Sequence, residues 1–468
     1  MTTTGNRRGS RPARSDTFVF FGATGDLAFK QIFPALAGLI GEGEWDMPII
    51  GVARHGDVAG LRDRAAKSLA SAGITDARLR HRLQQQLRFV RGDLDDPETF
   101  RRLRAELGKA RHPLHYLAIP PDLFAEVVRM LGESDCARGA RVIVEKPFGR
   151  NLSAAKRLNA VLHEVLDEQA IFRIDHFLAK EQVQNLVYFR FANRFLEPIW
   201  SAQHVASVQV TMAEDFGVED RGEFYDAAGV IRDVVQNHIL QTIGVLAMEP
   251  PSRIAADALS NAKVRLLDAI RPLRPADVVR GQYAGYRKTD GVAPDSTTET
   301  YVALRLAIDA ERWKGVPFYI RAGKCLPLTA TEVLVELKTA PFELFDERTT
   351  RHANQIRFQL TPDMSISMRA RAKKPGEELV GEDVELYASH QSGAELPPYQ
   401  RLLGDASTGD PLLFARQDTV EAAWRIVDRV LDLPDQPHRY PRGTWGPRAS
   451  AELLLRGERW HVPHIGRD

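Results

Sequence analysis

The sequence predicts an α/β domain with a doubly wound parallel sheet, followed by a larger α+β domain with a mostly antiparallel sheet. Two observations carry this prediction. Up to about residue 175, short continuous apolar runs alternate with segments of helical periodicity, which is typical of strands buried on both faces between helices. After residue 181, apolar and polar residues alternate within each run, which is typical of an antiparallel sheet with one covered face.

The first domain begins with an apolar run at 17–21 that ends in a glycine-containing turn. Helix-spaced apolar residues follow at 29–40, so this stretch reads as strand, turn and helix. Further strands are expected at 48–54, 87–90, 115–119, 141–144 and 170–174, and further helices at 57–72, 97–109, 122–132 and 153–168. The last strand leads to the carboxyl edge of the sheet, where ligands bind in Rossmann-like doubly wound folds.

The second domain is expected to open with a helix at 182–192. Its alternating runs predict strands at 206–212, 301–306, 318–321, 332–337, 355–360 and 365–368. Helices between about 221 and 277, and from 398 to 430, are expected to cover this sheet. The predicted boundaries are therefore a disordered basic tail at 1–16, a first domain at 17–175 and a second at 176–468.

The composition excludes several classes of partner. The chain has 468 residues, 44% of them hydrophobic, and a formal net charge of +1, so no strong overall field favours nucleic acid or a membrane surface. No apolar run reaches the roughly 18 residues of a membrane span. Cys136 and Cys325 lie far apart in the sequence and form neither a disulfide framework nor a metal cluster, which suits a reducing cytoplasm.

The turn after the first strand is a candidate nucleotide site. Gly22, Thr24 and Gly25 are small enough to let backbone N–H groups and a helix N-terminus face a pyrophosphate. An unliganded strand–helix turn has the same pattern, so the motif alone is not decisive. Arg54 follows the second strand, where a cation favours the 2′-phosphate of NADP over the free ribose of NAD. A solvated surface arginine is the alternative.

Charged residues also follow the later strands of the first domain. Lys146 precedes Pro147 just after a buried strand, which suggests a fixed turn and a possible cis peptide. Asp175, His176 and Lys180 follow the last strand. If a helix begins there, His176 and Lys180 share one face near a helix N-terminus, which outlines a phosphate site. The alternative is a solvated, charged helix start.

A stretch of the second domain combines polar residues with a helix rich in Val and Ile. Glu214 precedes it, and Asp233 and His238 lie within it. Buried polar groups must be paired, so these side chains are expected to bond a ligand or one another. A histidine in such a helix is usually a satisfied core residue. A carboxylate partner such as Asp175 would instead make His238 a candidate general base. The sequence shows no zinc-ligand spacing, so no metal site is expected.

These residues lie in segments that resemble glucose-6-phosphate dehydrogenase along nearly the whole chain after residue 16. The segments that carry the resemblance are 22–28, 116–121, 145–149, 173–181, 184–186, 190–193, 232–251 and 321–324. The resemblance implies oxidation of β-D-glucose 6-phosphate at C1 by NADP, without a metal, to give the 6-phosphoglucono-lactone. It places the nucleotide in the first domain, and substrate binding and oligomer contacts in the second.

The resemblance also implies a role for each site residue. His238 would be the general base and Asp175 would orient it. The residues expected to bind substrate are Lys146, His176, Lys180, Glu214, Asp233 and Lys324. The residues expected to bind the cofactor are Gly22, Thr24, Gly25, Asp26, Leu27, Arg54 and Lys146.

The chain departs from the family pattern at five positions. Phe177 stands where Tyr is usual, and Ala179 where Gly is usual. Gln31 replaces a common Lys, Thr329 stands where many relatives carry a second cation, and Thr361 stands where Gln is frequent. The missing Tyr hydroxyl predicts a raised KM for substrate, because an ordinary hydrogen bond contributes on the order of 1 kcal/mol.

Two alternatives remain open. A related dehydrogenase could accept NAD or another aldose phosphate, and a non-catalytic paralogue could bind the same ligands and regulate an active partner. The resemblance implies a homodimer or homotetramer built through the large antiparallel sheet.

Overall fold

The computed structural model describes residues 12–339, 353–376, 379–389 and 396–464, which divide into two compact units. Among these, the first unit comprises the chain up to Gly149, Ser153–Ala179 and Leu396–Gln417. The second comprises Arg150–Leu152, the described residues from Lys180 to the gap before Leu396, and those from Asp418 onward. Each unit is therefore assembled from separate stretches of the chain.

These units differ from the contiguous domains predicted at 17–175 and 176–468. The first unit also includes Leu396–Gln417, because this segment packs into its core. Leu402, Leu403 and Ala406 are fully buried there in the same apolar cluster as Phe33 and Leu36. The helical periodicity of the segment was visible in the sequence, but periodicity alone does not reveal which core a helix covers.

The predicted disordered tail at 1–16 is wrong for its last residues, while residues 1–11 lie outside the described part. Ser15 is buried, and its N–H donates to the carbonyl of Ser407. The Asp16 carboxylate accepts hydrogen bonds from the N–H groups of Arg111 and His112, at 2.7 and 3.0 Å. A polar, basic stretch is thus fixed by backbone bonds that composition does not predict.

The described residues of the first unit form one seven-stranded sheet in the order β15-β6-β5-β4-β1-β2-β3. Its parallel strands are β1 (Thr17–Phe21), β2 (Ile49–Ala53), β3 (Leu87–Arg91), β4 (Pro113–Leu117), β5 (Arg141–Val144) and β6 (Ile171–Ile174). The short β15 (Phe414–Ala415) pairs antiparallel with β6 at the edge. The order 3-2-1-4-5-6 is that of a doubly wound dinucleotide-binding sheet, so the predicted fold class is confirmed.

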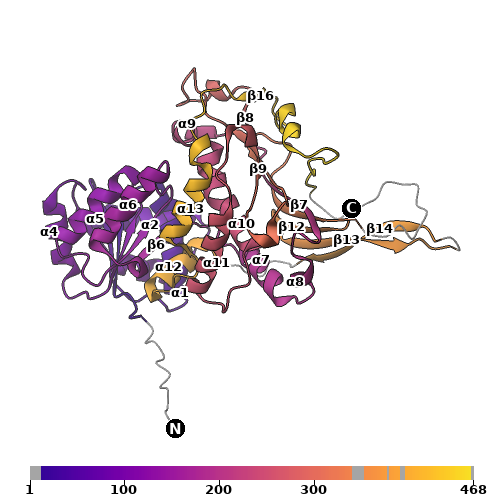
Figure 1. The fold of residues 1–468 in the computed structure, drawn as a ribbon. Coiled ribbons are helices and arrows are strands. Elements are labelled where there is room, and N and C mark those ends of the chain that lie inside the picture. Colours follow the sequence, from indigo (N-terminus) through magenta and orange to yellow (C-terminus); the bar gives the residue numbers. More distant parts are fainter. Residues whose placement is uncertain (1–11, 340–352, 377–378, 390–395, 465–468) are drawn as a thin grey trace, which may run out of the picture. The chain divides into compact units, whose positions relative to one another are not determined.

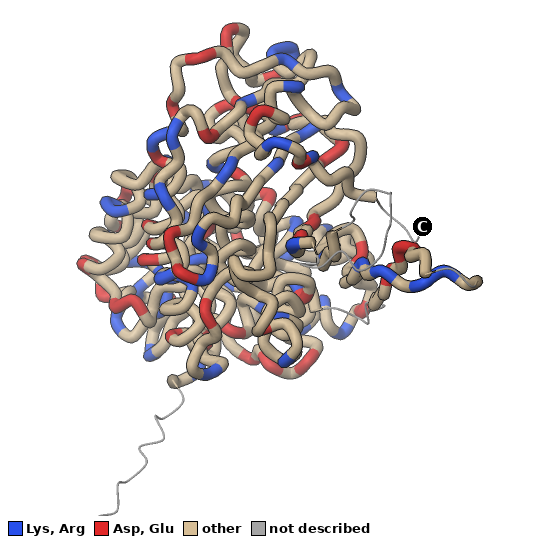
Figure 2. Tube along the Cα trace, turned by 45° about the vertical axis from the view of Figure 1, so that its right-hand side comes forward, with Lys and Arg blue, Asp and Glu red and all other residues tan. Residues whose placement is uncertain are grey.

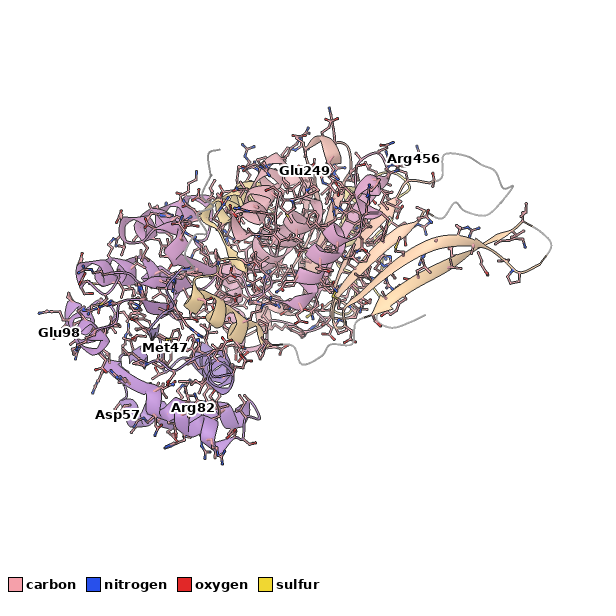
Figure 3. All side chains as sticks on the ribbon, turned by 90° about the horizontal axis from the view of Figure 1, so that it is seen from below. Met47, Asp57, Arg82, Glu98, Glu249 and Arg456 are labelled. Atoms are coloured by element: carbon pink, nitrogen blue, oxygen red, sulfur yellow. The ribbon has the colours of Figure 1, made fainter. Side chains whose placement is uncertain are left out.

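Helices cover this sheet (Figure 1). They are α1 (Phe33–Gly41), α2 (Val58–Ser71), α3 (Ala77–Gln86), α4 (Pro97–Leu107), α5 (Phe124–Glu133), α6 (Leu152–Val165) and α12 (Pro398–Thr408). The sequence did not predict α3, which buries only Leu83 and so has little apolar periodicity. Asp57 caps α2 by accepting from the Gly60 N–H at 2.8 Å, and Glu98 lies in the first turn of α4 (Figure 3). Both carboxylates suit the positive ends of helix dipoles.

The described residues of the second unit form a nine-stranded sheet in the order β14-β13-β12-β11-β7-β10-β9-β8-β16. The strands are β7 (Val205–Ala213), β8 (Val278–Tyr283), β9 (Tyr301–Leu306), β10 (Phe318–Gly323), β11 (Ala330–Leu337), β12 (Gln355–Thr361), β13 (Ser365–Lys373), β14 (Gly381–Ser389) and β16 (His438–Tyr440). Two neighbouring pairs are parallel, β7 with β10 and β8 with β16, and the others are antiparallel. The predicted mostly antiparallel sheet is confirmed, although β8, β14 and β16 were not predicted.

The helices of the second unit include a π-helical segment that carries Asp233 and His238. They are α7 (Glu181–Ala192), α8 (Leu196–Ile199), α9 (Gly222–Val230), the π-helical segment η5 (Ile231–Ile239), α10 (Leu240–Ala247), α11 (Ala256–Ala269) and α13 (Gln417–Val427). The helical region predicted from 398 to 430 is divided by β15.

The distribution of charged residues and the length of the apolar helices agree with what the composition predicts. Lys and Arg intersperse with Asp and Glu along the trace (Figure 2). In the part of the chain that the structure describes, no helix combines the length and apolarity needed to cross a bilayer.

Candidate active site

The glycine turn of the first unit lies between β1 and a π-helical segment, η1 (Ala28–Ile32), that runs into α1. Gly22 has φ +79°, and a Cβ built on it would lie 2.2 Å from the carbonyl oxygen of Ala118. The N–H of Gly25 donates to the Gly22 carbonyl at 2.9 Å. Backbone conformation and close approach therefore both require glycine at position 22. The turn leaves Thr24, Gly25 and Asp26 exposed, which is the arrangement a pyrophosphate cradle needs.

Arg64 is a cation at this turn that the sequence interpretation missed. Its guanidinium donates to the Gly25 carbonyl at 2.9 Å and lies 5.1 Å from the centroid of the Phe29 ring. Asp26 forms long ion pairs with Arg64, at 3.9 Å, and with Lys30, at 3.8 Å. Arg64 lies in the middle of α2, where an arginine has no distinguishing sequence signal. Gln31, in place of a common cation, is exposed, and Arg64 and Lys30 remain as cations near Asp26.

Arg54 follows β2 at the same carboxyl edge. Its side chain is 62% exposed, and its Nε lies 3.0 Å from Asp93 Oδ1. The Leu94 N–H and the Arg54 guanidinium both lower the pKa of Asp93. An exposed pair of this kind contributes little net stability, so the guanidinium can turn to a phosphate at small cost.

Lys146 follows β5 and is adjacent in sequence to Glu145, whose carboxylate bonds two tyrosines. The Lys146–Pro147 peptide is cis, as the sequence suggested. The neighbouring Glu145 accepts a hydrogen bond from the Tyr116 hydroxyl and also bonds Tyr399. Burial raises the pKa of Glu145, against the opposing effect of these tyrosines and of Lys146. The sequence singled out Lys146 but not this cluster, because Tyr399 comes from the distant helix α12.

Asp175 and His176 follow β6 in a tight turn. Asp175 is 2% exposed, and its Oδ1 accepts from the Phe177 N–H at 3.1 Å. Phe177 and Ala179, the two departures in this stretch, are both 3% exposed. The predicted helical face shared by His176 and Lys180 is wrong, because 176–179 form turns and α7 begins only at Glu181. Lys180 is the N-cap residue of α7.

In the second unit, η5 carries both Asp233 and His238. Residues five apart would be separated by about 140° around an α-helix. In a π-helix the backbone bond runs from i to i+5, so these two residues fall on adjacent turns of one side. His238 is 7% exposed, and its carbonyl accepts from the Thr242 hydroxyl at 2.7 Å. The spacing of the pair therefore suits this helix type and would not suit an ordinary one.

Glu299 holds the start of η5. Its Oε1 accepts from the Ile231 N–H at 3.2 Å, and its carbonyl accepts from the Val230 N–H at 3.0 Å. Gly229 has φ +70°, and a Cβ there would lie 2.4 Å from Glu299 Oε1. Glu299 is 3% exposed, and this burial raises its pKa. Sequence reasoning missed Glu299, which lies about 60 residues beyond the helix that it caps.

Glu214 and Lys324 are brought together by the sheet. They follow β7 and β10, which are parallel neighbours, so their carboxyl ends lie side by side. Lys324 Nζ lies 2.5 Å from Glu214 Oε2. The ammonium also lies 5.0 Å from the Phe216 ring centroid and 5.2 Å from that of Tyr225. Two predicted substrate residues therefore form a paired donor and acceptor.

Two of the departures also lie in the second unit. Thr329 Oγ1 donates to Asp215 Oδ1 at 2.5 Å and accepts from the Asp215 N–H at 3.1 Å. Many relatives carry a cation at this position. In this chain Thr329 instead fixes the loop after Glu214. Thr361 ends β12 and precedes the cis Thr361–Pro362 peptide.

The predicted site residues thus fall into two sets. The first unit holds Gly22, Thr24, Gly25, Asp26, Leu27, Arg54, Lys146, Asp175 and His176. The second unit holds Lys180, Glu214, Asp233, His238 and Lys324. The pairing of Asp175 with His238 joins residues of different units and stays a prediction.

Comparison with known proteins matches the chain to two consecutive family domains. Residues 19–185 match the family model of the glucose-6-phosphate dehydrogenase NAD binding domain, and residues 187–461 match that of its C-terminal domain. The chain is 45% identical to glucose-6-phosphate 1-dehydrogenase 1 of Mycobacterium tuberculosis over 97% of each chain. It is 37% identical to the glucose-6-phosphate 1-dehydrogenase of Aggregatibacter actinomycetemcomitans, over 96% of this chain and 98% of that one.

Two solved structures are similar over nearly the whole chain. A glucose-6-phosphate 1-dehydrogenase from Mycobacterium avium aligns with a TM-score of 0.91 and 45% identity, covering 97% of this chain and all of that one. A glucose-6-phosphate dehydrogenase in complex with its substrate glucose 6-phosphate aligns with a TM-score of 0.88 and 32% identity, covering 96% of this chain and all of that one.

Proposed function

Because the chain belongs to the glucose-6-phosphate dehydrogenase family, we propose that it oxidises β-D-glucose 6-phosphate at C1 and reduces NADP, giving 6-phosphoglucono-lactone. The observation that supports this most is the grouping in the second unit of Asp233 with His238 on η5, and of Glu214 with Lys324 at the sheet end. These groups supply a base, two acceptors and a donor, which is the set that a sugar hydroxyl array requires.

His238 is the proposed general base. It takes the proton of the C1 hydroxyl as the C1–H bond breaks and its electron pair leaves as hydride, so that C1 becomes a carbonyl. A ring nitrogen of a neutral imidazole can accept this proton. Asp175 is proposed to hold the ring orientation and to stabilise the imidazolium that forms. NADP, when bound, supplies the acceptor for the hydride.

The remaining polar groups are proposed to position the substrate. His176 and Lys180 would bind the 6-phosphate, for which cations and a helix N-terminus are both favourable. Lys146, Glu214, Asp233 and Lys324 would bond the sugar hydroxyls. Holding C1 in a fixed near-attack geometry can contribute roughly 7–11 kcal/mol to such a reaction.

The residues of the first unit fit a dinucleotide. A side chain at Gly22 is excluded by the close approach of the Ala118 carbonyl. Thr24, Gly25 and Asp26 are exposed, and Leu27 follows them. Both features support a pyrophosphate site at the turn. The exposed Arg54, and Lys146 at the same edge, support NADP as the nucleotide. Because Arg54 is already paired with Asp93, NAD is the alternative that has to be measured.

The test is turnover of the purified protein. The ultraviolet absorbance of reduced nicotinamide should rise when protein, NADP and glucose 6-phosphate are mixed. Folded protein that binds glucose 6-phosphate and gives a flat trace would instead support a regulatory paralogue. Parallel runs with NAD, and with unphosphorylated glucose, decide the cofactor and the need for the phosphate.

Oligomer and location complete the proposal. We place the contact between copies on the nine-stranded sheet, whose edge strand β14 exposes Leu386 and Tyr387. Sedimentation analysis should then give a dimer or tetramer, and Leu386→Lys should shift it toward smaller species. Cys136 and Cys325 are both free thiols and buried, which suits the cytoplasm.

A further inference from the structure

Tyr225 contacts Lys324, one of the proposed sugar residues, but has so far been given no role in the site. It belongs to α9, is 3% exposed, and packs edge-on against Tyr286 with ring centroids 6.3 Å apart. Its own ring faces the ammonium of Lys324 at 5.2 Å. The aromatic body of Tyr225 is therefore fixed on one side by the core and on the other by a proposed substrate residue.

The Tyr225 hydroxyl differs from those of Tyr286 and Tyr440, which belong to the same cluster. Tyr286 donates to Asp226 at 2.9 Å, and Tyr440 donates to the Lys324 carbonyl at 2.6 Å. The Tyr225 hydroxyl is buried, yet it has no hydrogen-bond partner among the residues that the structure describes. The Tyr301 hydroxyl of the same cluster also lacks one, but it lies near Arg321 and Ser450. Buried polar groups rarely stay unpaired, and an exception calls for an explanation.

The charges around this hydroxyl keep it protonated. Burial, and then the carboxylates of Asp233, Glu214 and Glu299, hold the pKa of Tyr225 well above its ordinary value. Glu299 already accepts from the Ile231 N–H, and Glu214 is paired with Lys324. The hydroxyl is thus a neutral donor that stands beside the two carboxylates proposed to bind the sugar.

We propose that the Tyr225 hydroxyl donates a hydrogen bond to the 2-, 3- or 4-hydroxyl of the bound sugar, which makes Tyr225 a specificity-determining residue. The inference rests on the proposed function. A sugar hydroxyl both donates and accepts, so it is fully satisfied only between an acceptor and a donor. Glu214 and Asp233 are the acceptors of this site, and Lys324 and Tyr225 are its donors.

The variant that tests this is Tyr225→Phe, which removes the hydroxyl and keeps the ring against Lys324. Tyr301→Phe is the matched control. Tyr301 is fully buried in the same aromatic cluster, and its hydroxyl lies near Arg321 and Ser450 and not beside the sugar residues. Calorimetry with glucose 6-phosphate should show about fivefold weaker binding for Tyr225→Phe, the loss expected for one ordinary hydrogen bond. Binding by Tyr301→Phe should equal that of wild type.

Deoxy sugars show whether the contact is direct. Glucose 6-phosphate analogues lacking the 2-, 3- or 4-hydroxyl are compared on wild type and on Tyr225→Phe. One analogue should bind both proteins equally, because the hydroxyl that Tyr225 bonds is absent from it. Each of the other analogues should retain the fivefold difference.

Three results would overturn the inference. Equal affinity of wild type and Tyr225→Phe for glucose 6-phosphate would show that the proposed hydrogen bond does not form, even if turnover is normal. A loss that is the same with every deoxy sugar shows an indirect effect. A melting temperature for Tyr225→Phe well below that of wild type shows that the hydroxyl has a structural partner. If wild type binds glucose 6-phosphate but does not turn it over, the proposed function fails while the affinities still decide the role of Tyr225.

Discussion

The two sheets of this protein collect polar residues in different ways. In the first unit, Gly22, Arg54, Lys146 and Asp175 each follow a different parallel strand, β1, β2, β5 and β6. Parallel strands end at one edge, so the topology alone gathers these residues. The second sheet is mostly antiparallel, and successive strands end at opposite edges. It gathers Glu214 and Lys324 only because β7 and β10 form one of its two parallel pairs among the described strands.

The second unit uses a different local feature to place its proposed base, His238. An α-helix through 231–239 would turn Asp233 and His238 to different sides, whereas the π-helical segment η5 aligns them. Glu299 and Gly229 fix where this segment starts. In the parallel sheet, polar residues gather because all strands end at one edge. In the mostly antiparallel sheet, they gather through local features, the parallel pair of β7 with β10 and the π-helical segment η5.

The largest expected effect follows from removing the residue that η5 places. His238→Ala should lower kcat by about 10³, since a positioned general base contributes roughly 10²–10⁴. The Kd for glucose 6-phosphate should change little. His163→Ala, which removes a histidine of the first unit bonded to Gln417, should keep normal turnover. Turnover by His238→Ala within tenfold of wild type would show that η5 does not carry the base.

The second-largest effect is expected at Gly22, which follows strand β1 of the parallel sheet. Gly22→Ala and Gly73→Ala both place a side chain at a φ near +75°, at +79° and +73°. The new Cβ overlaps the Ala118 carbonyl at Gly22, and meets nothing within 4 Å at Gly73. Gly22→Ala should therefore lower the free energy of unfolding by about 3 kcal/mol and weaken NADP binding, while Gly73→Ala costs about 1 kcal/mol. Chemical denaturation and NADP titration measure both, and equal costs would mean that the turn relaxes freely.

A smaller effect is expected at a departure from the family pattern. Phe177→Tyr should lower the KM for glucose 6-phosphate about fivefold, because it supplies one hydroxyl for the phosphate. The KM for NADP should stay the same, which distinguishes a phosphate contact from a general change in the turn after β6. An unchanged KM for the sugar phosphate would contradict this account of Phe177.

The smallest effect concerns the cap of η5 and depends on pH. Burial raises the folded-state pKa of Glu299, so its protonated form is favoured by folding. Its stabilising contribution is complete below the unfolded pKa of about 4.3, and is lost as the pH rises through the folded value. Glu299→Gln keeps an acceptor for the Ile231 N–H but does not titrate. The Tm of wild type should therefore fall relative to Glu299→Gln as the pH rises above about 4.3.

The control for this pH dependence is Glu223→Gln, which changes an exposed carboxyl of α9. Its Tm should run parallel to that of wild type across the same range. Parallel curves for Glu299→Gln as well would show that Glu299 does not titrate differently in the folded protein.

The sequence predicted the elements whose pattern reflects burial. Strands buried on both faces, such as β1, and alternating strands, such as β9, were placed within one or two residues. Helix α3 and the edge strand β14 were missed, because their residues are mostly exposed and impose no apolar period. The resemblance supplied the site residues.

The supporting residues could not be predicted in the same way. Arg64, Tyr399, Glu299 and Tyr225 act through neighbours that are distant in sequence. Nothing at their own positions distinguishes them from ordinary surface or core residues. Only the folded backbone brings Glu299 to the start of η5 and Tyr225 to Lys324.

The return of Leu396–Gln417 to the first unit has a consequence for how the protein is made. Leu402 and Leu403 complete a core that also contains Phe33 and Leu36, and Tyr399 bonds Glu145, the residue before Lys146. During synthesis, the nucleotide-binding half emerges from the ribosome long before the segment that finishes it. Its apolar surface must stay uncovered until most of the second unit has been translated, so this is the stage at which the nascent chain depends most on chaperones.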